Sequence, residues 1–81
     1  MNKNLFLNTF AGVKGVSIGT AKVRISKMVW DVCRNEYIKL GYTAQDLNEA
    51  YDIFKEVKLQ KVFDTGMITV EGHDYNFLKV L

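Results

Sequence analysis

The strongest constraint on the fold of this chain is a stretch from Ala21 to about Leu40 that contains neither glycine nor proline. Gly41 follows it, where a residue with left-handed backbone commonly ends a helix, and Thr20 precedes it as the expected N-cap. The stretch predicts one helix of about five turns. Because a chain of 81 residues has room for one domain only, we expect a single domain over residues 1–81 that is organised around this helix.

Apolar residues cover more than half of the circumference of this helix when successive residues are placed about 100° apart. They are Ala21, Val23, Ile25, Met28, Val29, Trp30, Val32, Cys33, Tyr37 and Leu40. A stripe this wide predicts a helix that packs on two sides, either inside its own domain or against a second chain. The remaining narrow face is mainly basic and carries Arg24, Lys27, Asp31, Arg34, Asn35 and Ile38.

A second helix is predicted to begin after Thr43, because Thr43 and Asp46 form a variant of the capping box. Apolar residues then recur at spacings of three and four, at Leu47, Ala50, Tyr51, Phe54 and Val57. Glu49, Asp52 and Glu56 occupy the opposite side, which makes the exposed face acidic. The periodicity weakens at Lys58 and Lys61, so the predicted end lies between Val57 and Phe63.

Two further segments favour strands. Residues 4–10 carry apolar side chains at both odd and even positions, which predicts a short strand that is covered on both sides. Gly12, Gly15 and Gly19 then predict a turn with a short extended piece at Val16–Ile18. Residues 67–81 predict a β-hairpin with Gly72 and His73 in the turn. The expected cross-strand pairs are Val70 with Tyr75, and Ile68 with Phe77. The fold class is therefore α+β, with two helices packed on a small antiparallel sheet in the order β-α-α-β-β.

The charge of the chain changes sign along its length. Residues 1–40 carry seven basic and two acidic side chains, whereas residues 41–81 carry four basic and seven acidic ones, and the net charge is +2. Such asymmetry steers association with a charged partner. Five of the basic residues of the first half and two large aromatic residues are the expected partner-binding residues: Lys14, Lys22, Arg24, Lys27, Trp30, Arg34 and Tyr37.

Motifs for catalysis and for cofactors are absent from the sequence. The interval between Gly15 and Gly19 is too short for a P-loop, and no lysine follows it. Cys33 and His73 are the only cysteine and the only histidine, which is too few for a structural zinc site and fits a reducing cytoplasm. The first ten residues do not resemble a signal peptide, and no apolar run approaches the ~18 residues of a membrane span. We expect no enzyme activity, no cofactor, no metal and no small-molecule substrate.

Two functions remain after these exclusions. The first is a small, non-enzymatic protein-interaction module that binds a protein partner or forms a homodimer. The many lysines, asparagines and isoleucines, which have AT-rich codons, fit a phage gene, and this expectation includes a phage-encoded inhibitor or modulator of a host protein. The second is a small DNA-binding regulator that uses the basic first helix and the C-terminal hairpin as a wing.

Overall fold

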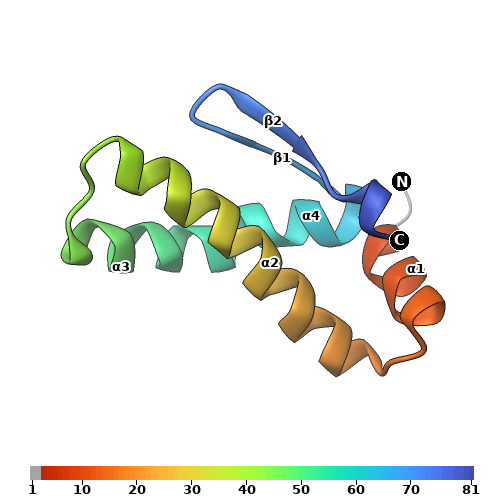
Figure 1. The fold of residues 1–81 in the computed structure, drawn as a ribbon. Helices are drawn as coiled ribbons and strands as arrows, with labels where there is room; N and C mark the ends of the chain where they lie inside the picture. Colours follow the sequence, from red (N-terminus) through yellow and green to blue (C-terminus); the bar gives the residue numbers. More distant parts are fainter. Residues whose placement is uncertain (1–2) are drawn as a thin grey trace.

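Three helices and a β-hairpin make up residues 3–81, the part of the chain that the computed structural model describes (Figure 1). In chain order, the elements are α1 (Leu5–Lys14), α2 (Ile18–Lys39), α3 (Ala44–Ile53), the π-helical segment η1 (Phe54–Lys58), α4 (Leu59–Thr65), β1 (Met67–Val70), β2 (His73–Asn76) and the 3-10 turn η2 (Leu78–Val80). α3, η1 and α4 follow one another without a break and form the third helix. The predicted α+β class is confirmed, but the predicted count of two helices and the order are wrong.

The first segment is a helix and not the predicted strand. Phe6, Leu7, Phe10 and Ala11 are all buried and recur at helical spacing. Their occurrence at both odd and even positions fits a helical stripe as well as a strand that is covered on both sides, and periodicity alone does not separate the two. Tertiary contacts secure the helical alternative, since the backbone N–H of Asn4 donates to the Asp64 carboxylate of α4 at 2.6 Å.

The long helix predicted from Ala21 is present as α2, and it begins earlier than expected. Its N-cap is Ser17, whose hydroxyl accepts a hydrogen bond from the backbone N–H of Thr20 at 3.1 Å. Thr20 is therefore inside the helix, and the predicted extended piece at Val16–Ile18 shrinks to two residues. Gly19 lies in the first turn, where a glycine is tolerated and does not delay the start of the helix.

The third helix begins as predicted and continues further than predicted. Thr43 and Asp46 form the expected capping box, with both reciprocal hydrogen bonds present. The helix ends only at Thr65, before Gly66 with its left-handed backbone. Within it, the π-helical η1 adds a residue to one turn and thereby rotates the buried stripe. Val57, expected on the apolar side, is 66% exposed, and Lys58 is half-buried in its place. This rotation explains why the sequence periodicity weakens at Lys58.

The hairpin is present with a register that differs from the predicted one. The observed pairs are Met67 with Asn76, Ile68 with Tyr75, Thr69 with Asp74 and Val70 with His73. The central turn residues are Glu71 and Gly72, with φ of 50° and 79°, as the tight twisted turn of a two-residue hairpin requires. The prediction failed because it assigned only Gly72 a positive φ. Within residues 3–81 the sheet has two strands, and helices cover its apolar face instead of the predicted third strand.

The helix α2 runs diagonally across the α3–α4 helix, with the hairpin on one side of it and α3 on the other (Figure 1). α1 packs against α4 and α2, and β1 packs against α4. The radius of gyration is 12.9 Å, against about 11.7 Å for a compact chain of this length. This crossing leaves an open angle between α2 and α3. Within residues 3–81, no helix combines the length and the apolar character that a membrane crossing needs.

Candidate binding groove between α2 and α3

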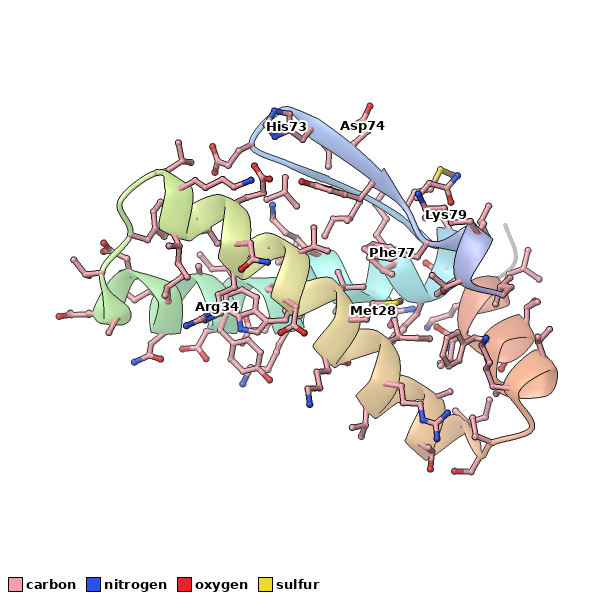
Figure 2. The ribbon with its side chains drawn as sticks, viewed as in Figure 1. Met28, Arg34, His73, Asp74, Phe77 and Lys79 are labelled. Atoms are coloured by element: carbon pink, nitrogen blue, oxygen red, sulfur yellow. The ribbon has the colours of Figure 1, made fainter. Side chains whose placement is uncertain are left out.

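A groove of about 730 Å³ lies in the angle between α2 and α3. We call it the basic groove, because its lining contains three basic side chains and no acidic one. From α2 it is lined by Lys22, Val23, Ser26, Lys27, Trp30 and Arg34, and from α3 by Ala44, Leu47, Asn48 and Tyr51. Figure 2 shows Arg34 reaching from α2 toward α3.

Helical spacing brings these residues to one surface. On α2, the residues at 22, 26, 30 and 34 follow one another at intervals of four, and those at 23 and 27 lie beside them. On α3, the residues at 44, 47, 48 and 51 recur at three and four. Residues at these intervals share one side of a helix. The groove is therefore the meeting of two continuous helical stripes, and each stripe extends over at least two turns.

Aromatic rings form the floor of the basic groove. The ring of Trp30 is half-buried, with its centroid 5.0 Å from that of Tyr51 and 5.3 Å from that of Phe54. Tyr51 remains 38% exposed and Val23 remains 69% exposed. The groove therefore presents apolar surface that the chain does not cover itself, which is a common property of interaction sites.

The three cations of the groove take part in no ion pair within residues 3–81. Within residues 3–81 the ion pairs are Lys39 with Glu36, Lys55 with Asp52, and His73 with Glu36. None of them involves Lys22, Lys27 or Arg34. Three cations that form no ion pair, in a groove whose lining holds apolar surface and no acid, attract a negatively charged group.

The predicted partner-binding residues divide into those inside the groove and those outside it. Lys22, Lys27, Trp30 and Arg34 line it. Arg24 is exposed but lies outside the groove lining.

Two other predicted residues lie elsewhere in the structure. Tyr37 is buried, and its ring stacks on that of Tyr42 with centroids 4.7 Å apart. Lys14 is the last residue of α1, and its ammonium lies 6.0 Å from the centre of the Phe10 ring. We therefore restrict the candidate site to the basic groove.

The wall that α3 contributes was not anticipated from the sequence. The sequence predicts Leu47 and Tyr51 as core residues, because they belong to the apolar stripe of their helix. Leu47 and Tyr51 line the groove because α2 and α3 cross at an angle that exposes one edge of that stripe. Sequence periodicity gives the stripe but not the position of this crossing.

A second polar cluster, on the hairpin side of α2, was also missed. Glu36 is 8% exposed and accepts a hydrogen bond from the Tyr75 hydroxyl at 2.7 Å. Nδ1 of His73 lies 2.9 Å from the other carboxylate oxygen of Glu36, and Nζ of Lys39 lies 3.6 Å from the oxygen that accepts from Tyr75. The hydrogen bonds that the carboxylate accepts, first from Tyr75 and then from His73, lower the pKa of Glu36 below its usual 4.5. The sequence did contain a signal for this cluster, since Glu36 is an acidic residue at a position that falls among the apolar positions of α2.

This cluster joins α2 to the hairpin, and we interpret its role as structural.

Cys33, one turn before Glu36, is buried, and burial raises the pKa of its thiol to about 11. A thiol with so high a pKa is a poor nucleophile at neutral pH. Within residues 3–81 no group of histidine, cysteine and acidic residues has an arrangement that would hold a metal ion.

Comparison with known proteins adds no relative, since no family model, no curated protein and no solved structure matches this chain.

Proposed function

We propose that this chain is a small, non-enzymatic protein-interaction module that binds another protein through the basic groove. The observation that carries this proposal is the coincidence of three unpaired cations with exposed aromatic and aliphatic surface in one concave site. Charge steers the encounter with an acidic partner, and buried apolar contacts then hold the complex. Inhibition or modulation of a host protein by a phage-encoded chain is one form of this activity.

The single buried cysteine is compatible with action in a reducing cytoplasm. Homodimerisation through the same groove is a second form of protein binding, and the measurement of mass described below separates it from binding of a different protein.

A small DNA-binding regulator is the alternative, and the three unpaired cations are the observation that favours it. Two features weigh against it. The hairpin, which would serve as the wing, packs on the opposite side of α2 from Arg34 (Figure 2). Lys55 also covers part of the Tyr51 ring, with its ammonium 4.8 Å from the ring centre, which leaves less of the ring for the stacking of bases.

The test is an affinity capture from a lysate of the organism that carries the gene, with and without nuclease. The chain is used as wild type, as the double variant Lys27→Glu/Arg34→Glu, and as the matched control Arg24→Glu, which reverses an exposed charge outside the groove. Light scattering on each purified chain reports its mass.

We expect a stoichiometric protein that survives nuclease, is lost with the double variant and is retained with Arg24→Glu. Capture that disappears with nuclease and falls steeply with salt would instead establish the DNA-binding alternative. Capture that the double variant does not change would remove the groove from the proposal.

A further inference from the structure

We infer that the basic groove receives an amphipathic helix of the partner, acidic on the side that it presents, and this inference rests on the function proposed above. The walls of the groove are two helices whose contact residues recur at three and four. The ridges of a third helix fit such walls, with axes about 8–10 Å apart. The bound helix would complete a three-helix layer and cover Val23 and Tyr51, which the chain leaves exposed.

The spacing of the cations sets the spacing of the partner's acids. Lys22 and Lys27 are five residues apart on α2, and Lys27 and Arg34 are seven apart, which correspond to rises of about 7.5 Å and 10.5 Å. On a partner helix aligned with α2, positions i, i+4 and i+11 are separated by rises of about 6 Å and 10.5 Å, close to those between the cations. These three positions also lie within about 40° of one another around the partner helix. Three carboxylates at these positions lie on one side of the partner helix. Lys27 and Arg34, within about 20° of one another around α2, approach it from one edge of the groove lining, and Lys22, about 140° from Lys27, approaches from the other edge.

The floor of the groove sets the apolar position. Trp30 lies between Lys27 and Arg34 along α2, and Leu47 and Tyr51 face it from α3. On the partner helix, position i+7 falls between the second and third acids and within about 20° of the first. A leucine there would bury its side chain against Trp30. The expected pattern is therefore acid, acid, leucine, acid at i, i+4, i+7 and i+11.

Other occupants fit these intervals less well. An extended peptide repeats one face about every 6.6 Å, which approximates the first interval of the cations but not the second. A second copy of this chain offers the acidic face of α3 and η1, with Glu49, Asp52 and Glu56 at spacings of three and four. That spacing differs from the required one, and Asp52 already pairs with Lys55 at 3.6 Å.

The test uses three synthetic helical peptides of about 16 residues in an alanine and glutamine background. The matched peptide has glutamates at its positions 2, 6 and 13 and a leucine at 9. The displaced peptide has the same composition, with the glutamates at 4, 8 and 15, so that they lie about 100–140° from the leucine around the helix. The broken peptide is the matched one with a central proline. Fluorescence anisotropy measures binding of each to the full chain.

We expect the matched peptide to bind at least about tenfold more tightly than either control peptide, because the displaced glutamates lie on another side of the helix from the leucine, and the proline breaks the helix that aligns the glutamates with one another. Lys27→Glu should weaken its binding by at least about tenfold, whereas Arg24→Glu should leave it unchanged. Replacing the second glutamate of the peptide by lysine should restore binding to Lys27→Glu and weaken binding to the wild type. Circular dichroism of each variant confirms that it folds.

Three results would overturn the inference. Equal binding of the matched and displaced peptides would show that only net charge counts. Absence of binding by the matched peptide at about 1 mM would exclude the helix, and the proposed function would still stand if a protein is captured through the groove. Self-association of the wild-type chain that Lys27→Glu abolishes would assign the groove to a second copy.

Discussion

The charged side chains on the two sides of α2 differ in whether they have partners within the chain. On the hairpin side, the carboxylate of Glu36 is nearly buried and is surrounded by Tyr75, His73 and Lys39. On the groove side, Lys27 and Arg34 are exposed and have no acidic neighbour in the groove lining. Charge that is satisfied within the chain fixes one element against another, while charge that is left unsatisfied is free to act on a partner. Variants on the two sides should therefore differ in what they disturb.

The largest loss of stability is expected where the hairpin leaves α4. Gly66 has a φ of +73°, and a Cβ there would lie 2.6 Å from the buried ring of Phe6. Gly66→Ala should lower the free energy of unfolding by about 3 kcal/mol, from backbone strain together with overpacking. Urea denaturation measures the change.

Gly41→Ala is the matched control for this prediction. Gly41 also has a positive φ, of +88°, but its Cβ would meet open space. The backbone strain alone should cost about 1 kcal/mol. Equal losses at the two positions would show that the contact with Phe6 contributes nothing.

A smaller, pH-dependent loss is expected for Glu36→Gln. Because the pKa of Glu36 is lower in the folded chain, its contribution to stability is complete above about 4.5 and is lost as the pH falls through the folded value. The difference in unfolding free energy between wild type and variant should therefore be larger at pH 6 than at pH 3. Denaturation at both values measures it, and a constant difference would contradict the assigned hydrogen bonds.

The smallest change in stability is expected in the groove. Lys27→Glu/Arg34→Glu should alter the free energy of unfolding by less than about 0.5 kcal/mol, since neither side chain has an ion pair to lose. The same measurement on Arg24→Glu provides the reference for an exposed charge. A loss above about 1 kcal/mol for the double variant alone would make the groove cations structural and would remove the contrast between the two sides.

Local signals in the sequence were sufficient for part of the fold. The absence of glycine and proline between Ala21 and Leu40 predicted α2, and Thr43 with Asp46 predicted the start of the third helix. They were insufficient for residues 5–14, where the same apolar spacing fits a strand or a helix. The docking of Phe6 and Phe10 in the core favoured the helix there.

The candidate site was predictable in the same partial way. Periodicity placed Lys27 and Arg34 on one face of α2, because residues seven apart lie on the same side of a helix. It grouped Arg24 with them and gave Tyr37 as a surface anchor, although Arg24 lies outside the groove and Tyr37 is buried. The distinction depends on where α3 crosses α2, and no interval within α2 contains that information.

The sequence by itself therefore determined the elements whose cause is local, namely the caps, an uninterrupted helix, a hairpin turn near Gly72 and an uneven distribution of charge. The tertiary structure alone decided which charges found partners. Glu36 accepts a hydrogen bond from Tyr75 of the hairpin, 39 residues away. Lys22, Lys27 and Arg34 instead line a groove whose α3 residues include no acid. The reason is physical, because an ion pair or a groove depends on distances between elements, and those distances are set only when the helices and the hairpin pack on one core.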